Sequence, residues 1–181
     1  MLDGGLVDAL ASSQRLGMIG KRPIDEVIEH ATAFVAALVN VSGTVIDLGA
    51  GGGVPGLVIA TARPDLHLIL IDRRATRTDH LRRLVRSLEV GARVDVVTAD
   101  ATTLGGWEAD AAVARGFGPP ATTLRAASDA VRAGGMIVVS EPPTREPRRW
   151  PVELLRRCGV AAVPSPDARV ATFRRRVPRE T

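Results

Sequence analysis

The chain has one cysteine (Cys158), one lysine (Lys21) and no tyrosine among its 181 residues. A lone cysteine excludes an internal disulfide and a zinc site built on several thiolates, so we expect no bound metal. With three phenylalanines and two tryptophans, the chain is too poor in aromatic residues for a platform that stacks several bases of single-stranded nucleic acid.

Long apolar runs are missing as well. The run Leu66–Ile71 is only as long as a β-strand, whereas a membrane span needs about 20 apolar residues. The first eight residues contain two acids and no basic residue, which is unlike a secretory signal. We therefore expect a cytoplasmic protein that does not span a membrane.

Arginine supplies nearly all of the positive charge. Lys and Arg together number 24 against 20 Asp and Glu, which gives a net charge of +4. A basic balance suits a polyanionic partner such as nucleic acid, although a coding bias that replaces lysine by arginine explains the excess of arginine equally well. Six arginines cluster near the expected second strand and the helix after it, where they either follow an RNA backbone or form a solvated helix face: Arg73, Arg74, Arg77, Arg82, Arg83 and Arg86.

Apolar residues recur with alternating strand and helix periods along the chain, which predicts an α/β fold. Residues 1–22 show only weak periodicity. Gly134 and Gly135 are expected to end a helix. The expected helices are Ile24–Val39, Pro55–Ala62, Thr76–Leu88, Ala121–Ala133 and a short one ending at Leu154–Arg157. The expected strands are Thr44–Leu48, Leu66–Ile71, Val94–Thr98, Asp110–Ala114, Met136–Ser140, Val160–Val163 and Val170–Arg174.

This order predicts a doubly wound, mostly parallel, seven-stranded Rossmann-like sheet with helices on both faces. We expect residues 1–43 to form a short helical lead-in and residues 44–181 to form the main domain, the two making one compact unit. The oligomeric state is left open by the sequence, with a monomer favoured.

The most informative segment joins the first expected strand to the helix that follows it. Between Gly49 and Gly56 five of the eight residues are glycine, so the backbone can adopt positive φ angles and a ligand can approach the main chain. Free N–H groups at the start of the next helix point into the same space. Parallel sheets bind ligands at this edge, and we expect the turn to form the floor of a nucleoside-sized pocket.

Two ligand classes fit this turn, besides a purely structural turn without a ligand. The pattern Gly51-x-Gly53-x-x-Gly56 matches the dinucleotide fingerprint, with Asp72 about 20 residues further on. The longer pattern Asp47-x-Gly49-x-Gly51-x-Gly53 resembles motif I of class I methyltransferases, which bind S-adenosylmethionine. A carboxylate under the loop opposes a pyrophosphate but suits a sulfonium and an ammonium group. Asp72 would then accept hydrogen bonds from the ribose hydroxyls.

The end of the third expected strand adds a further candidate. Asp100 stands where this fold faces the adenine, and its carboxylate can accept a hydrogen bond from the adenine amino group, although a strand-end turn residue is a common alternative. The next residue, Ala101, offers an N–H to the ring.

The sequence Asp47–Gly56, followed by Ala62–Asp65 and a strand ending in Asp72, resembles the RsmG (GidB) family, which methylates N7 of a guanine in 16S ribosomal RNA. The Pro-Gly pair after the glycines and the Ala-Arg-Pro after the helix are the most telling features. Val113–Phe117 resembles the family's Ser-Arg-Ala-Phe motif, and His30 matches its Arg-His position. The resemblance implies cofactor contacts at Gly49, Val54, Ala101, Thr102 and Arg115.

The resemblance also implies a catalytic role for Arg115 beside the cofactor, and 16S rRNA or the small ribosomal subunit as partner. Guanine N7 has a free lone pair and no proton, so its methylation needs no general base and depends on positioning. Arg115 would hold the guanine or a phosphate; an ion pair with a strand-end acid is the alternative. A packed or capping role for His30 is favoured over a catalytic one.

Some family features are altered on the acceptor side. The family's Lys-Gly pair after the fifth strand is Glu141-Pro142 in this chain, and a glutamate there would repel a phosphate. Two other hypotheses therefore stand beside methylation of guanine N7: a related methyltransferase for a small molecule or protein, and a nucleotide-binding module without catalysis.

Overall fold

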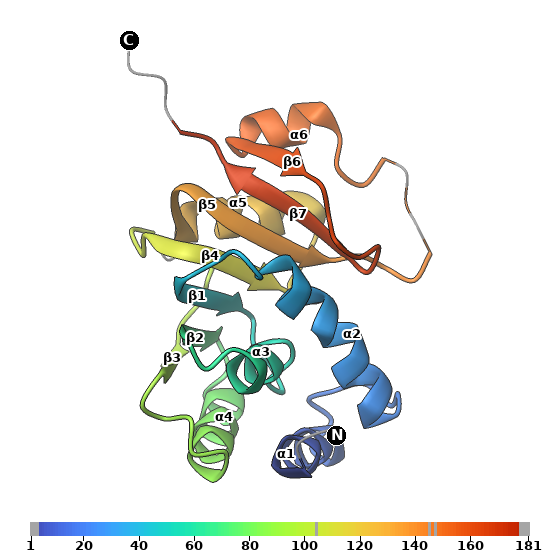
Figure 1. Ribbon diagram of the computed structural model, residues 1–181, viewed down its shortest axis with the longest axis vertical. Helices are drawn as coiled ribbons and strands as arrows, with labels where there is room; N and C mark the ends of the chain where they lie inside the picture. Colours follow the sequence, from blue (N-terminus) through green and yellow to red (C-terminus); the bar gives the residue numbers. More distant parts are fainter. Residues whose placement is uncertain (1–3, 104, 145, 147, 178–181) are drawn as a thin grey trace.

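The computed structural model of the chain describes residues 4–103, 105–144, 146 and 148–177. Its seven strands form one sheet in the order β3-β2-β1-β4-β5-β7-β6 (Figure 1). The strands are β1 (Gly43–Leu48), β2 (Leu66–Asp72), β3 (Val94–Thr98), β4 (Ala109–Ala114), β5 (Val131–Ser140), β6 (Val160–Val163) and β7 (Val170–Arg175). The helices are α1 (Gly4–Arg15), α2 (Ile24–Ala37), α3 (Gly56–Ala62), α4 (Ala75–Ser87), α5 (Pro120–Ala130) and α6 (Val152–Arg157).

Strand direction makes most of this sheet parallel. β1 pairs in parallel with β2 and β4, β2 with β3, and β4 with β5. β7 lies between β5 and β6 and is antiparallel to both. The predicted doubly wound, mostly parallel, seven-stranded fold is therefore confirmed, and the carboxyl ends of β1, β2, β3, β4 and β5 meet along one edge.

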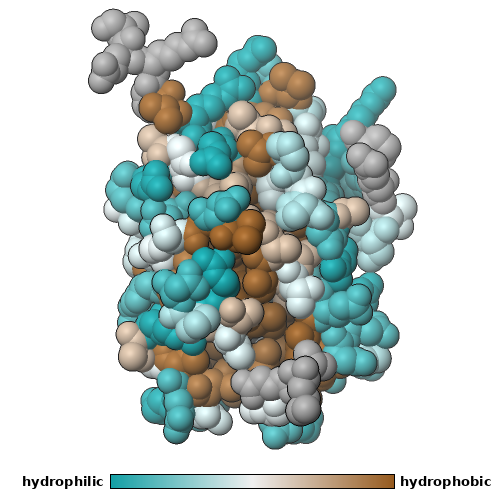
Figure 2. All heavy atoms as spheres, viewed as in Figure 1, coloured by the Kyte–Doolittle hydropathy of each residue, from teal (hydrophilic) through white to brown (hydrophobic). Residues whose placement is uncertain are grey.

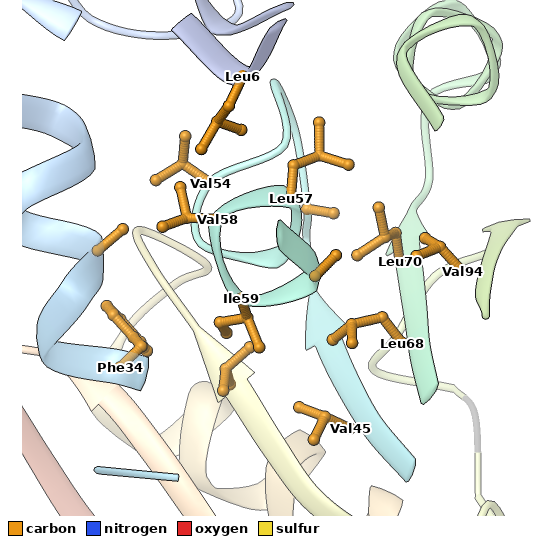
Figure 3. Close-up of a cluster of buried hydrophobic side chains, with 14 of the residues drawn as sticks. Leu6, Phe34, Val45, Val54, Leu57, Val58, Ile59, Leu68, Leu70 and Val94 are labelled. Atoms are coloured by element: carbon orange, nitrogen blue, oxygen red, sulfur yellow. The ribbon is translucent and has the colours of Figure 1, made fainter. Parts of the chain in front are cut away.

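Helices cover both faces of the sheet because its strands are apolar on both sides. On β1, Val45 belongs to the core cluster that includes α1, α2, α3 and α4, whereas its neighbour Ile46 belongs to the cluster with α5 and α6. Within the first cluster, α3 lies between Phe34 of α2 and the side chains of Leu68 and Leu70 on β2 (Figure 3). This packing places the glycine-rich turn before α3 at the carboxyl edge of the sheet.

Helix α1 occupies a segment where the sequence shows only weak periodicity. Its buried face consists of Leu6, Ala9, Leu10 and Ser13, and small residues such as Ala9 and Ser13 give a weak hydrophobic signal. Ser13 is buried because its Oγ forms a hydrogen bond of 2.9 Å with Nε2 of His80 on α4. The division into a lead-in of residues 1–43 and a main domain stays a prediction.

The predicted boundary between α5 and β5 is wrong, whereas the other predicted bounds lie within two residues of the observed ones. The helix expected over Ala121–Ala133 ends at Ala130, and β5 begins at Val131. Gly134 and Gly135 thus lie inside β5 and do not stop the helix. Pairing explains the difference, since Ala109 of β4 pairs with Val131 but Ala111 pairs with Met136. The extra residues form an irregularity in the strand, where Gly134 adopts a φ of +76°.

The surface shows polar and apolar regions on the same face. In the view of Figure 2, polar residues cover both flanks and apolar residues form a band between them. Among the described residues, no helix is both long enough and apolar enough to span a lipid bilayer.

Candidate functional site

The turn between β1 and α3 is shaped by contacts that need glycine. Gly51 adopts a φ of +54°, a conformation that side chains disfavour, and its N–H donates a hydrogen bond of 3.0 Å to Asp72 Oδ2. At Gly56 a Cβ atom would lie 2.4 Å from Leu70 and 2.6 Å from Asp47 Oδ2. The glycines therefore let the turn lie close to the ends of β1 and β2.

Asp72, the last residue of β2, holds the turn in place. Besides the Gly51 contact, its Oδ1 accepts a hydrogen bond of 2.9 Å from the Arg74 N–H, and Arg77 Nη1 lies 3.4 Å from Oδ2. The Asp72 side chain is almost fully buried. Each carboxylate oxygen can accept two hydrogen bonds, so one acceptor position on Oδ1 remains for a ligand in the cavity beside it.

Asp47 lies beneath the turn. Its Oδ2 accepts a hydrogen bond of 2.8 Å from the Gly56 N–H, while its buried Oδ1 has no hydrogen-bond partner within the described part of the chain. Burial raises the pKa of Asp47 to about 7, against the lowering effects of the Gly56 N–H and of Arg115. Asp47 therefore titrates near neutral pH, and a positive charge above it would favour its ionised form.

A cavity of about 340 Å³, which we name the β2 cavity, opens at the ends of β2 and β3. Asp72, Asp100 and Ala101 line it together with Thr102 and Gly49. Asp100 Oδ1 accepts hydrogen bonds from both the N–H (2.9 Å) and the hydroxyl (2.7 Å) of Thr102, and these bonds lower the pKa of Asp100. Asp100 is thus both a turn residue and a cavity residue.

A smaller cavity of about 190 Å³, the loop cavity, follows the glycine-rich turn. Gly49, Gly51, Val54 and Arg115 line it. Gly49 and Arg77, as well as Gly116, line both this cavity and the β2 cavity. The two cavities are therefore adjacent and suit one elongated ligand.

A third cavity of about 340 Å³, the β5 cavity, lies beyond the end of β4. Arg115 and Gly116 line it, as do Arg22, His30 and Glu141. Arg115 therefore lies between the loop cavity and the β5 cavity. Burial lowers the pKa of its guanidinium, an effect that Asp47 opposes. Asp47 lies near the carboxyl end of β1, so the alternative of an ion pair between Arg115 and a strand-end acid stays a prediction.

His30 of α2 lies in the wall of the β5 cavity. Its Nδ1 is buried and has no hydrogen-bond partner among the described residues. Burial lowers the pKa of His30, and the nearby positive charge of Arg115 lowers it further. The side chain also packs near the ring of Phe34, with centroids 6.4 Å apart.

Most of the predicted site residues come together in these cavities, with two exceptions. Asp47 and Gly53 line none of the three; both are buried, and a Cβ atom at Gly53 would lie 2.5 Å from Leu57. Asp47 lies beneath the turn, and Gly53 is part of it, with a φ of +98°. Met18 and Ile19, in the segment between α1 and α2, line the loop cavity and were not predicted as site residues. Apart from the two flanking glycines, nothing in the sequence of that segment indicates that it contributes to a binding site.

Solved structures share this fold. An S-adenosylmethionine-dependent O-methyltransferase from Thermotoga maritima superposes with a TM-score of 0.67 and 14% identity, over 96% of this chain and 73% of that one. A 1,6-didemethyltoxoflavin N1-methyltransferase from Burkholderia thailandensis, solved with bound S-adenosylhomocysteine, gives a TM-score of 0.60 and 20% identity over 96% and 88% of the two chains. The fold is that of class I S-adenosylmethionine-dependent methyltransferases.

The family follows from the sequence match. The chain belongs to the GidB family, rRNA small subunit methyltransferase G, whose model matches residues 7–142. The ribosomal RNA small subunit methyltransferase G of Kineococcus radiotolerans is 30% identical over 82% of this chain, and that of Salinispora arenicola is 40% identical over 50% of it. These matches span 60% and 39% of the two relatives' own lengths. The predicted family and its class, S-adenosylmethionine-dependent methyltransferases, are confirmed.

Proposed function

We propose that this chain transfers a methyl group from S-adenosylmethionine to N7 of a guanine in 16S ribosomal RNA, as a monomer in the cytoplasm. One observation carries the proposal. Gly116, at the end of β4, lines all three cavities, and Arg115 beside it lines the loop cavity and the β5 cavity. A donor in the first two cavities and an acceptor in the third would therefore meet at Arg115 and Gly116.

The chemistry of the lining residues fits the cofactor. Asp72 and Asp100 offer carboxylate oxygens at the ends of β2 and β3, which suit ribose hydroxyls and the adenine amino group. Ala101 and Thr102 line the same end, and Gly49, Gly51 and Val54 leave room along the turn. Asp47, with an unpartnered buried oxygen, offers negative potential to a cation above the turn. When bound, the cofactor supplies an electrophilic methyl group.

The acceptor side needs positioning and no proton removal. Guanine N7 carries a lone pair and no proton, so a residue that aligns the base and excludes water is sufficient. Arg115 can donate hydrogen bonds from its planar guanidinium to the guanine O6 atom or to a neighbouring phosphate. It acts as a fixed positive charge, because an arginine cannot serve as a base near neutral pH.

The test is transfer of tritiated methyl groups to three acceptors: immature small ribosomal subunits, naked 16S RNA and a metabolite extract. We expect label in the RNA at a guanine that becomes sensitive to reductive cleavage. Arg115→Lys should lower the rate at least about tenfold because it removes a planar, bidentate donor. Arg125→Lys is the matched control, since Arg125 is exposed on α5 and lines none of the three cavities.

Other results would replace this proposal. Label confined to the metabolite extract would identify a methyltransferase for small molecules. Cofactor binding without transfer to any acceptor would identify a non-catalytic module. Binding of NAD in place of S-adenosylmethionine would assign the glycine-rich turn to a dinucleotide.

A further inference from the structure

Glu141 is the carboxylate of the β5 cavity. It follows β5 directly, where the resemblance to the family predicts a lysine, and it lines the cavity with Arg115 and His30. Its side chain is 16% exposed. A cavity built to hold a phosphate is not expected to present a carboxylate, because two negative charges at close range repel each other.

Neighbouring residues hold this carboxylate in one position. Trp150 Nε1 donates a hydrogen bond to Glu141 Oε1, and Arg149 Nε lies 3.6 Å from Oε2. The Arg149 guanidinium stands 5.1 Å from the centroid of the Trp150 ring, which packs edge-on against Phe173 of β7 at 5.0 Å. Because Phe173 is fully buried in the sheet, the carboxylate is anchored to the core and Arg149 offsets its charge.

Glu141 keeps hydrogen-bonding capacity toward the cavity. A carboxylate oxygen has two acceptor positions, and the described contacts use one on Oε1, while Arg149 lies beyond ordinary hydrogen-bond distance from Oε2. Two oxygens side by side match a ligand edge that carries two adjacent N–H donors. Guanine has such an edge in N1–H and the 2-amino group. Adenine has an acceptor at N1 and no 2-amino group.

The strand order sets the orientation of a base in this cavity. The sheet runs β2-β1-β4-β5, so the end of β5 lies farther from the β2 cavity than the end of β4, which carries Arg115 and Gly116. A guanine with N7 facing the end of β4 turns its N1–H and 2-amino edge away from β4. That direction leads toward β5 and Glu141.

We propose that Glu141 determines base specificity by accepting hydrogen bonds from the N1–H and the 2-amino group of guanine. This inference rests on the proposed function, since it takes the β5 cavity as the acceptor site. It explains why a carboxylate lies beside Arg22 and Arg115 in this cavity. Arg115 contacts the guanine O6 atom and leaves the N7 lone pair free, and Glu141 contacts the edge that carries the N–H donors.

Equilibrium dialysis with guanosine and with inosine, in the presence of S-adenosylhomocysteine, tests the inference. Inosine lacks only the 2-amino group, and both nucleosides are uncharged. We expect the native chain to bind guanosine about tenfold more tightly than inosine, as a bidentate contact requires. In Glu141→Gln this preference should fall to within about twofold, because an amide presents a donor where an acceptor is needed.

Glu146→Gln is the matched control. Glu146 is in the same loop and lies 3.7 Å from Arg149, but it is 60% exposed and does not line the β5 cavity. It should keep the native preference. Glu141→Asp retains the charge and should keep part of the preference for guanosine. It serves as a second variant in case Glu141→Gln fails to fold.

Two results would overturn the inference: an unchanged preference in Glu141→Gln, or native protein that binds guanosine no better than inosine. These results are distinct from failure of the proposed function. A chain that methylates no RNA, yet binds guanosine in a manner that depends on Glu141, would contradict only the proposed function.

Discussion

Asp47 and Asp72 are both buried acids at the carboxyl edge of the sheet, and their surroundings give them different roles. Asp72 lines the β2 cavity and accepts two backbone N–H bonds with separate oxygens. Asp47 lines none of the three cavities and leaves one buried oxygen without a partner. We therefore expect Asp72 to contribute to ligand contact, and Asp47 to contribute through its charge.

The raised pKa of Asp47 predicts a stability effect with a definite sign. Since the pKa rises from 3.8 to about 7 on folding, the native state holds a proton that the unfolded chain releases, and its stability falls as the pH rises from about 4 to 7. Asp47→Asn keeps an acceptor for the Gly56 N–H and cannot ionise. At pH 8 it should be more stable than the native chain by about 2 to 4 kcal/mol.

Denaturant unfolding of both proteins at pH 5 and pH 8 measures this effect. The advantage of Asp47→Asn should shrink at pH 5, where the native carboxyl group is mostly protonated. An advantage that does not change with pH would show that Asp47 titrates near its ordinary pKa in the folded chain.

Cofactor affinity should depend on Asp72. Asp72→Asn keeps the volume of the side chain but loses the charge and one acceptor oxygen, which should weaken binding of S-adenosylmethionine about 10- to 100-fold, given about 1.5 to 3 kcal/mol for hydrogen bonds to charged groups. Calorimetric titration measures this. Asp79→Asn is the control, because Asp79 is 63% exposed on α4 and pairs with Arg82. Equal affinities for both variants would place the ribose elsewhere.

At the level of the elements, the segment after α1 contributes cavity residues that were not predicted from the sequence. α1 packs against α2, α3 and α4, and the chain then passes the loop cavity at Met18 and Ile19 and the β5 cavity at Arg22. Docking of α1 therefore positions part of the wall of both cavities.

The packing of α1 can be tested through Leu10, which is fully buried. Leu10→Ala should destabilise the chain by about 2 to 5 kcal/mol, as other large-to-small changes in a core do. Leu16→Ala is the comparison, since Leu16 is 58% exposed and its truncation should change the free energy of unfolding by less than about 0.5 kcal/mol. Chemical denaturation monitored by circular dichroism gives both values, and similar values would mean that α1 is not docked in solution.

At the scale of the whole molecule, the arginines are distributed unevenly around the three cavities. Arg73, Arg74 and Arg77 line the β2 cavity, and Arg22 and Arg115 line the β5 cavity. Arg83 and Arg86 are exposed on α4 and line none of the three cavities. The arginine group recognised in the sequence is thus divided by the fold into cavity residues and residues farther along the helix.

This distribution predicts the salt dependence of RNA binding. The double variant Arg22→Ala/Arg73→Ala removes two exposed cations that have no ion pair among the described residues, and should lower the slope of log affinity against log salt concentration by about 2. Arg83→Ala/Arg86→Ala should leave the slope nearly unchanged. Filter binding to 16S RNA at several salt concentrations measures both slopes. A larger decrease in slope for Arg83→Ala/Arg86→Ala would show that the RNA binds along α4 instead.

Local features of the chain were sufficient for the fold class and for much of the candidate site. Apolar periodicity marks each strand and five of the six helices, since burial acts on every second or every third to fourth side chain. The spacing of Asp47, the glycines and Asp72 marks the turn, because a glycine such as Gly56 has no Cβ atom to collide with the residues of the neighbouring strands. Gly134 and Gly135 misled the prediction, as glycine marks an irregular strand as well as a helix end.

Contacts between segments that are distant in the sequence are determined only by the tertiary structure. The buried Ser13 of α1 finds its hydrogen-bond partner in His80, 67 positions further along the chain. The separation of Asp47 from the cavities likewise depends on the path of the turn above it. From the sequence, Glu141 was expected only to repel a phosphate. Its partners Trp150 and Arg149, and its place beyond Arg115, arise from the order of the strands, which periodicity along the chain does not encode.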